Sequence, residues 1–317
     1  MNSLADTLRN IDYHSLAISN YSRNYILRML PAIDYYLAIY ERCLDHMLAS
    51  NPELTLVDYG GGHGFFSLAA KRRGVKNVIY IDHNAQAKEA AQAVASIVGI
   101  SADTYLCGDE QTLAEWCRDQ RCKIDVLAGM DVIEHIHRLV LFFDTLMGLN
   151  RNMKMVFTTG SNPKNPFIRR KLRRVMINDE NLFGEQRRQY IAENHPEIED
   201  TRSWADASRG LTFADIDRLI DSHCSLEVAK TESMTLCRDI YNTCDPANGS
   251  WTERILPLNE YKGILWKYHV PIHVERGFYN TRRGGIKCLA SSILNAILQV
   301  PGTIALAPFI ILKINYR

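Results

Sequence analysis

Hydrophobic positions in the first 50 residues recur at the three- and four-residue steps that are typical of amphipathic helices. The residues that carry the pattern are Tyr25, Ile26, Met29, Leu30, Ile33, Tyr36, Leu37 and Tyr40. A single proline, Pro31, lies within this pattern. We therefore expect residues 1–50 to form an N-terminal helical cap or lid.

From Leu54 onward the pattern changes to short runs that favour β-structure. Four such runs cover residues 54–57, 78–81, 124–127 and 155–158. The sequence between them is compatible with helices and long enough for crossover connections. This alternation predicts an α/β fold in residues 51–160, with a mostly parallel sheet covered on both faces.

Residues 161–210 interrupt this alternation with prolines, arginines and an acidic patch, which indicates a helical insertion. Thr212 followed by Asp215 resembles a capping box and predicts the start of a helix. The apolar face of that helix consists of Phe213, Ile216, Leu219 and Ile220. We expect residues 211–317 to complete the core, with the sheet resuming near residues 226–229.

The C-terminal region has no charged residue between Lys287 and Lys313, a stretch long enough to span a bilayer. One interpretation is a shallow or re-entrant membrane segment over residues 288–312, flanked by basic residues. Those basic residues are Arg282, Arg283, Lys287, Lys313 and Arg317. Pro301, Gly302 and Pro308 interrupt the stretch. The other interpretation, which we favour because the predicted sheet would otherwise lack its last strand, is a terminal antiparallel strand over residues 309–314 behind a packed helix at 289–298.

The composition mainly argues against certain partners, cysteine motifs and targeting signals. With a formal net charge of +1, the protein has no strong overall positive field that would attract nucleic acid, so no nucleic-acid partner is expected. The 8 cysteines have irregular spacing and no C-x-x-C pair, which is typical of reduced core cysteines rather than zinc or redox motifs. The first residues lack a basic stretch followed by an apolar run, so we expect no secretory signal and a cytoplasmic protein, with membrane association as the alternative.

A glycine-rich turn at residues 58–64 carries the strongest chemical signal. It follows a buried-strand run and leads into a helix at residues 65–71. The dinucleotide fingerprint G-x-G-x-x-G fails here, because Phe65 or Ser67 stands where the last glycine is needed. The residues that do match a pattern, D-x-G-x-G-x-G, are Asp58, Gly60, Gly62 and Gly64. In this turn the chain resembles the class I, Rossmann-like methyltransferases that use S-adenosylmethionine.

Acidic residues follow the next two predicted strands. Asp82 ends the second strand, where a carboxylate is placed to accept two hydrogen bonds from a ribose diol. Asp109 follows the third strand, around 104–106, and the resemblance implies that it contacts the adenine amino group. The resemblance also implies that Asp58, Gly60, Gly62, Gly64 and Met130 bind the cofactor. The implied fold is a Rossmann-like three-layer sandwich.

The segment after the fourth strand contains Asp131, Glu134 and His135, which would share one face if a helix began there. It is similar to the E-x-x-E-H segment of ubiquinone-biosynthesis-type O-methyltransferases, in which these positions bind a divalent metal. Here Asp131 replaces the first glutamate and no further ligands are identified, so no metal site is assigned. His135 as general base, or a purely structural Glu134–His135 pair, are the alternatives.

A basic cluster in the insertion could hold a phosphate, a carboxylate or an anionic lipid surface, or be a solvated helix face. Its members are Arg169, Arg170, Lys171, Arg173 and Arg174, and the acids that would balance a solvated face are Glu193, Glu197, Glu199 and Asp200. The (N/D)-P-P-Y signature of amino-group methylation is absent. The sequence therefore predicts an enzyme that methylates an oxygen on a small molecule, glycan or lipid-linked intermediate. Its alternatives are a catalytically inactive cofactor-binding partner or regulatory subunit and, disfavoured by the glycine spacing, an NAD-dependent oxidoreductase.

Overall fold

Seven strands form one sheet in the order β3-β2-β1-β4-β5-β7-β6. The computed structural model describes residues 3–48, 53–282 and 284–316. The strands are β1 (Thr55–Tyr59), β2 (Asn77–Asp82), β3 (Thr104–Cys107), β4 (Val126–Met130), β5 (Lys154–Thr159), β6 (Ile272–Arg276) and β7 (Ile310–Ile314). Strands β1 to β5 pair in parallel, while β7 runs antiparallel to both β5 and β6. This confirms the predicted mostly parallel sheet with an antiparallel C-terminal strand.

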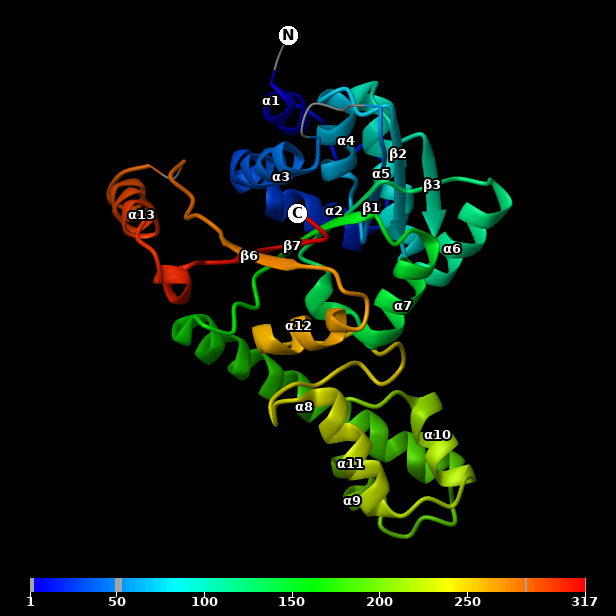
Figure 1. Ribbon diagram of the computed structural model, residues 1–317. Helices are drawn as coiled ribbons and strands as arrows, with labels where there is room; N and C mark the ends of the chain where they lie inside the picture. Colours follow the sequence, from blue (N-terminus) through cyan, green and yellow to red (C-terminus); the bar gives the residue numbers. More distant parts are fainter. Residues whose placement is uncertain (1–2, 49–52, 283, 317) are drawn as a thin grey trace.

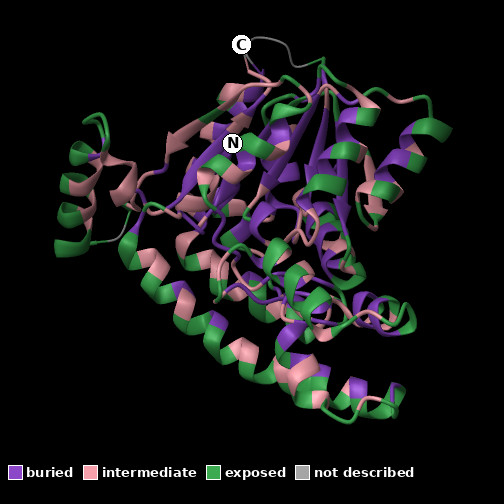
Figure 2. Cartoon of the chain, turned by 60° about the horizontal axis from the view of Figure 1, so that its bottom comes forward, coloured by how far each residue is buried: buried purple, intermediate pink, exposed green. Residues whose placement is uncertain are grey.

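Helices cover both faces of this sheet, which makes the three-layer sandwich (Figure 1). Successive strand residues face opposite layers, as in Leu56 and Val57, which belong to different hydrophobic clusters. One layer contains α3 (Ile33–Leu48), α4 (Phe65–Arg72) and α5 (Ala85–Val98). The other contains α6 (Glu110–Asp119), α7 (Leu139–Leu149) and α12 (Leu258–Trp266). Figure 2 shows the buried strands between these layers.

The N-terminal region is helical, as predicted. It contains α1 (Leu4–Arg9), α2 (Asn20–Met29) and a 3₁₀ turn, η1 (Leu30–Ala32), before α3 begins. Pro31 lies in that turn, where a missing backbone N–H does least harm. Apolar residues of α1, α2 and α3 join the cluster over the first face of the sheet, so this region is part of the core.

Four helices project away from the sheet as a lobe (Figure 1). They are α8 (Pro166–Asn194), α9 (Thr201–Ala207), α10 (Phe213–Asp221) and α11 (Leu226–Cys237). The capping box of Thr212 and Asp215 is present at the start of α10, as predicted. The expected strand at residues 226–229 is wrong, because these residues begin α11. Ala229, Ser233 and Cys237 are the buried residues of α11, and their four-residue spacing is that of a helix rather than a strand.

The C-terminal region confirms one expectation and corrects another. Strand β7 pairs with β5 in antiparallel register, as favoured from the sequence, whereas β6 was not predicted. The helix before it, α13 (Ile286–Ile297), is not packed: no residue of α13 is buried, and a 3₁₀ turn, η3 (Thr303–Leu306), leads back to β7. Within the described residues, no helix is long and apolar enough to cross a bilayer. Arg283 and Arg317, two of the flanking basic residues, lie outside the described residues.

Candidate functional site

The turn from β1 to α4 is built from glycines with left-handed backbone angles. The φ angles of Gly60, Gly62 and Gly64 are +67°, +53° and +79°. The amides of Gly60 and Gly61 both donate to the Ile81 carbonyl, at 2.9 and 3.1 Å, which holds the turn against the end of β2. A Cβ on Gly60 would lie 2.4 Å from Cγ2 of Val132. The turn therefore depends on glycine for both its angles and its packing.

Asp58 lies in the core rather than at the surface of this turn. Only 1% of the residue is exposed, and its carboxylate accepts hydrogen bonds from the amide and hydroxyl of Ser67, at 3.1 and 2.6 Å. Burial raises the pKa of Asp58 to about 7, although the Ser67 hydrogen bonds act in the opposite direction. Asp58 thus holds the first turn of α4 in place, and any contribution to a ligand would be indirect.

Asp82 connects the turn to the end of β2. Its carboxylate accepts hydrogen bonds from the amides of Gly62 and Asn84, each at 2.8 Å. The Tyr80 hydroxyl donates to the Gly62 carbonyl at 2.6 Å, which fixes the same glycine from its other side. A carboxylate can accept about four hydrogen bonds, so Asp82 retains capacity for two more.

A cavity of about 430 Å³ opens where the carboxyl ends of β1, β2, β3 and β4 meet. It brings together four residues predicted from the sequence, namely Gly60, Asp82, Asp109 and His135. The remaining lining residues are Tyr59, His83, Gly108, Glu110, Val132, Ile136, His137, Arg138, Leu141, Asn248, Gly249 and Ser250. The other predicted site residues are not among those that line it, and these are Asp58, Gly62, Gly64, Met130, Asp131 and Glu134.

Asp109 enters this cavity from the start of α6. Its Oδ1 accepts hydrogen bonds from the amides of Gln111 and Thr112, at 3.0 and 3.1 Å, and so caps the helix. The carboxylate is therefore held in one position by α6. Gly108 precedes it, and a Cβ there would lie 2.1 Å from the Thr112 hydroxyl oxygen.

The segment after β4 does not form the helix on which a shared face was predicted. Asp131 has a left-handed φ of +53°, and only one 3₁₀ turn, η2 (Ile133–His135), follows before α7 begins at Leu139. The three side chains have different hydrogen-bond partners. Asp131 accepts a hydrogen bond from the Thr158 hydroxyl at 3.2 Å, and Glu134 accepts one from the Gly160 amide, also at 3.2 Å. Of the three, only His135 lines the cavity.

His135 is held by a residue far along the chain. Its Nδ1 lies 2.7 Å from the Trp251 carbonyl oxygen, and the Trp251 amide donates back to the His135 carbonyl at 3.2 Å. Because a carbonyl can only accept, Nδ1 must carry the proton. The neutral ring therefore has its lone pair on Nε2, which is the arrangement of a general base.

Glu134 and Asp131 belong to a group of acids behind this turn. Glu134 is 1% exposed, and its Oε2 has no hydrogen-bond partner within the described chain. Burial, then the nearby Asp131 and Glu253 carboxylates, raise the pKa of Glu134 well above its ordinary value. Desolvation around its carboxylate, then the Glu253 carboxylate, also raise the pKa of Asp131, although the residue as a whole is exposed. The neutral form of Glu134 is thus favoured. In the described part of the chain, no three His, Cys, Asp or Glu residues are grouped so that they could hold a metal.

Several lining residues gave no signal in the sequence. The loop with Asn248, Gly249 and Ser250 closes one side of the cavity, more than 100 residues after β4. His137 is fixed by a contact of 2.9 Å between its Nε2 and the Gly210 carbonyl oxygen. Arg138 forms an ion pair of 2.5 Å with Asp215 of α10. The helical lobe therefore holds two residues that line the cavity, although none of its own helices lines it.

His63, inside the glycine-rich turn, was also missed. It is 6% exposed, its ring stacks on Tyr25 of α2 with 4.7 Å between centroids, and neither ring nitrogen has a hydrogen-bond partner among the described residues. Burial lowers the pKa of His63 to about 4. The ring is therefore neutral at pH 7 and connects the N-terminal helices to the turn.

We expect His63→Phe to reduce the loss of stability in acid. Between the unfolded pKa near 6.5 and the folded pKa of about 4, the unfolded chain binds a proton that the folded chain rejects, so acidification favours unfolding. This costs the wild type about 2 to 3 kcal/mol between pH 7.5 and 4.5. Urea unfolding of the wild type and of His63→Phe at both pH values measures this difference in stability. Asp58 titrates in both proteins and cancels in the difference, so equal pH dependences would contradict this account of His63.

No protein-family model matches this sequence, and no curated protein matches it. Solved structures do. A ribosomal protein L11 methylase from Lactobacillus delbrueckii subsp. bulgaricus is 27% identical over 38% of this chain and 57% of that chain, with a TM-score of 0.29. An S-adenosylmethionine-dependent methyltransferase from Mesorhizobium loti is 14% identical over 86% of this chain and 95% of that chain, with a TM-score of 0.44. One from Archaeoglobus fulgidus is 12% identical over 89% and 92%, with a TM-score of 0.43. At these scores the likeness adds nothing to what the strand order and cavity of this chain show by themselves.

Proposed function

We propose that this protein is a methyltransferase that uses S-adenosylmethionine and transfers the methyl group to an oxygen acceptor. One observation carries the proposal: Asp82, bonded to the glycine-rich turn, lines the same cavity as Gly60, Asp109 and His135. A cavity of about 430 Å³ lies within the size range of small-molecule sites. It also lies at the carboxyl ends of the parallel strands, where α/β sheets bind ligands.

The lining residues fit an adenosyl group. Asp82 has unused acceptor capacity for a ribose diol, and Asp109 is fixed by α6 where it can accept a hydrogen bond from an adenine amino group. Gly60 presents backbone without a Cβ at the mouth of the turn. The bound cofactor would supply an activated methyl group on a sulfonium. The protein contributes alignment and the exclusion of water, which account for most of the acceleration in such a transfer.

His135 is the residue that we assign to the acceptor. Its Nε2 lone pair lies on a ring whose other nitrogen is held by the Trp251 carbonyl, so it can take a proton from an acceptor hydroxyl. An oxygen nucleophile benefits from such a base. The acceptor class that we propose is therefore a hydroxyl group on a small molecule, glycan or lipid-linked intermediate.

A binding measurement followed by a transfer assay tests the function. S-adenosylhomocysteine should raise the melting temperature and NAD should not. Incubation with methyl-labelled S-adenosylmethionine and extracts separated into lipid, glycan, nucleic-acid and small-molecule pools should label one of the non-nucleic-acid pools. A higher melting temperature with S-adenosylhomocysteine but no labelled pool would support the inactive binding partner instead. Protection by NAD alone would refute the proposal.

We expect His135→Gln to remove transfer while leaving cofactor binding intact. Glutamine can still donate to the Trp251 carbonyl but has no basic nitrogen, so turnover should fall about 100- to 10,000-fold. The dissociation constant for S-adenosylhomocysteine, measured by calorimetry, should stay close to that of the wild type. His14→Gln, at an exposed position outside the cavity, is the control. Unchanged turnover in His135→Gln would eliminate the base.

A further inference from the structure

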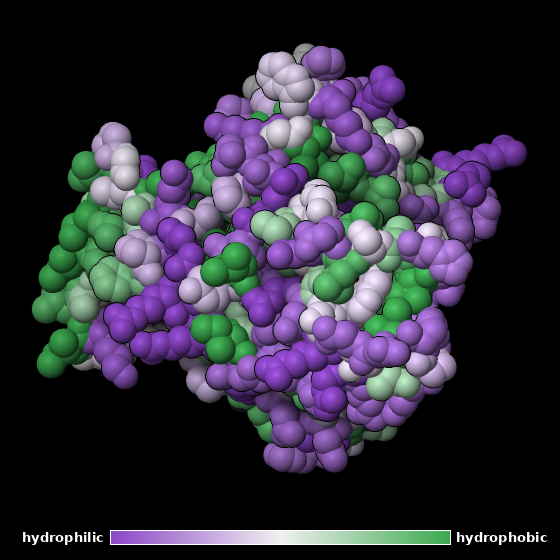
Figure 3. Space-filling model, turned by 90° about the horizontal axis from the view of Figure 1, so that it is seen from below, coloured by the Kyte–Doolittle hydropathy of each residue, from purple (hydrophilic) through white to green (hydrophobic). Residues whose placement is uncertain are grey.

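Helix α13 presents an apolar face to solvent. Its exposed large residues are Ile286, Leu289, Ile293 and Ile297, at 87, 63, 53 and 40%, and Val300 just beyond the helix adds 57%. At 100° per residue the four helical positions fall within one narrow stripe. Figure 3 shows apolar side chains gathered at this edge of the molecule. A stripe of this kind normally faces a core, but here it faces outward.

The opposite side of α13 is fastened to the protein, so the outward orientation is built in. Asn295 accepts a hydrogen bond from the Tyr279 amide at 2.7 Å and donates one to the Tyr279 carbonyl at 3.0 Å. Leu298, at the end of the helix, is only 3% exposed. The Tyr279 hydroxyl donates to the Leu306 carbonyl at 2.6 Å, which holds the segment after α13 as well.

The basic end of α8 lies beside this segment. Asn162 and Asn165, which directly precede α8, both donate to the Ala307 carbonyl, at 3.0 and 3.1 Å. Figure 1 shows the start of α8 next to the short red turn η3, which follows α13. Arg170, Lys171 and Arg174 are exposed on this part of α8, together with Phe167, which is 76% exposed.

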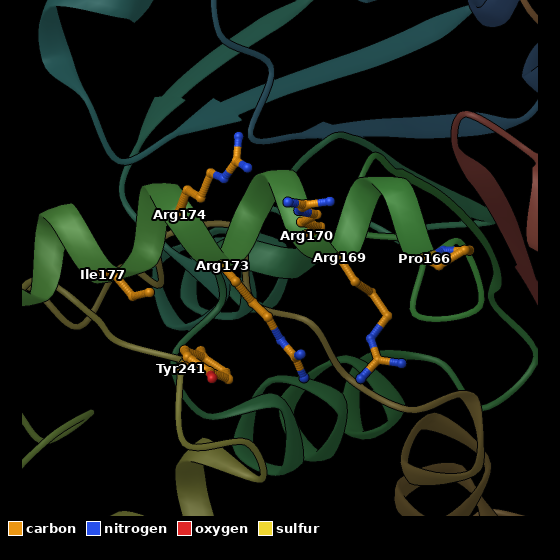
Figure 4. A pocket seen from close by; sticks show the side chains of 7 residues that line it. All are labelled: Pro166, Arg169, Arg170, Arg173, Arg174, Ile177 and Tyr241. Atoms are coloured by element: carbon orange, nitrogen blue, oxygen red, sulfur yellow. The ribbon is translucent and has the colours of Figure 1, made fainter.

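The basic cluster of α8 is not balanced by the acids at the other end of the helix. Glu193 is 22 residues beyond Lys171, which is about 33 Å along a helix. Within the described residues, Arg173 pairs with Asp239 at 3.4 Å, and Arg169 and Arg173 extend on one side of α8, toward Tyr241 in the case of Arg173 (Figure 4). Arg170 and Arg174 extend elsewhere, and neither forms an ion pair with another described residue. The acids from Glu193 to Asp200 therefore do not neutralise this cluster.

We propose that α13 and the start of α8 together form a docking surface for an anionic lipid bilayer. The sequence contains no acidic residue at 151–178 or 276–317, so both segments carry only positive charge. A helix of 12 residues is about 18 Å long and cannot span a hydrocarbon core of about 30 Å. It can lie in the interface with its apolar face among the acyl chains, while the cations of α8 contact lipid phosphates.

Charge favours a bilayer over a second copy of the chain. Two copies joined through this surface would bring the same cations together, which is destabilising. An anionic membrane instead neutralises them. One anionic bilayer can therefore cover the apolar stripe with its acyl chains and pair with the basic cluster through its phosphates.

Flotation with lipid vesicles tests the proposal on the full chain. Vesicles of phosphatidylcholine with about one third phosphatidylserine should bind the protein at least tenfold more tightly than phosphatidylcholine alone. Leu289→Ser combined with Ile293→Ser should weaken binding about tenfold or more, and so should Arg170→Glu combined with Arg174→Glu. The melting temperature should change little, because these side chains are already exposed.

Matched control variants distinguish specific docking through this surface from non-specific binding to vesicles. Ile97→Ser removes an apolar side chain with the same 53% exposure as Ile293, but from α5. Arg118→Glu with Lys123→Glu makes the same charge change at exposed positions around the end of α6. Both controls should bind vesicles like the wild type. Equal binding to neutral and anionic vesicles, equal loss in controls and test variants, or a lipid-free dimer that Ile293→Ser dissociates would each overturn the proposal.

Discussion

Asp82→Ala is expected to weaken the binding of S-adenosylhomocysteine about 100-fold or more. Hydrogen bonds to a charged group contribute about 1.5 to 3 kcal/mol each, and Asp82 has capacity for two to a ribose diol. The substitution also removes the acceptor of the Gly62 amide, which is 2.8 Å from the carboxylate, and so loosens the turn itself. Each 1.4 kcal/mol corresponds to a tenfold change in affinity. Isothermal titration calorimetry measures it directly.

A second aspartate provides the control. Asp103 accepts a hydrogen bond from the Val78 amide at 2.7 Å, near the amino end of β2 and away from the cavity. Asp103 lies just before β3, so Asp103→Ala removes a carboxylate that contacts the amino end of β2 without touching the proposed site. If the two variants bound S-adenosylhomocysteine with equal affinity, the assignment of the adenosyl site to the end of β2 would fail.

Gly60→Ala is expected to lower the free energy of unfolding by about 2 to 5 kcal/mol. A side chain at φ of +67° costs about 1 to 2 kcal/mol in backbone strain. The new Cβ would also lie 2.4 Å from Cγ2 of Val132, and such overpacking costs about 1 to 3 kcal/mol. Urea unfolding followed by circular dichroism measures the change.

A second substitution separates these two costs. Val132→Ala removes the atom that the new Cβ would meet, so Gly60→Ala should be less costly in that background. The backbone part should remain, and the double-mutant cycle gives the steric part as the coupling between the two sites. A stable Gly60→Ala protein with unchanged unfolding free energy would show that the turn does not require glycine there.

Much of the fold follows from local patterns in the chain. The short β-favouring runs correspond to β1, β2, β4 and β5, and the Thr212–Asp215 capping box begins α10. These elements were predictable because strand and helix periodicities are set by residues within a few positions of one another. The glycine-rich turn and Asp82 were predictable for the same reason, since each directly follows a strand.

Patterns misled where local sequence suits more than one structure. Residues 226–229 look like a short strand, yet burial at Ala229, Ser233 and Cys237 makes them the start of a helix. The spacing of Asp131, Glu134 and His135 is that of a helix. The left-handed backbone of Asp131 nevertheless prevents an α-helix from running through this segment. In both segments the contacts with distant elements decide the outcome.

The sequence by itself determined the order of strands β1 to β5 and of the helices between them, the glycine turn and the acidic residue at the end of β2. Only the tertiary structure decided that His135 lines the cavity with its Nδ1 held by a carbonyl oxygen, because Trp251, which supplies that oxygen, is 116 residues away. It also decided that Asp58 is buried, that residues 248–250 close the cavity, and that the apolar face of α13 points outward. Periodicity indicates which residues of a helix or strand share a face. The segment that each face packs against is decided by contacts between parts of the chain that are far apart in sequence.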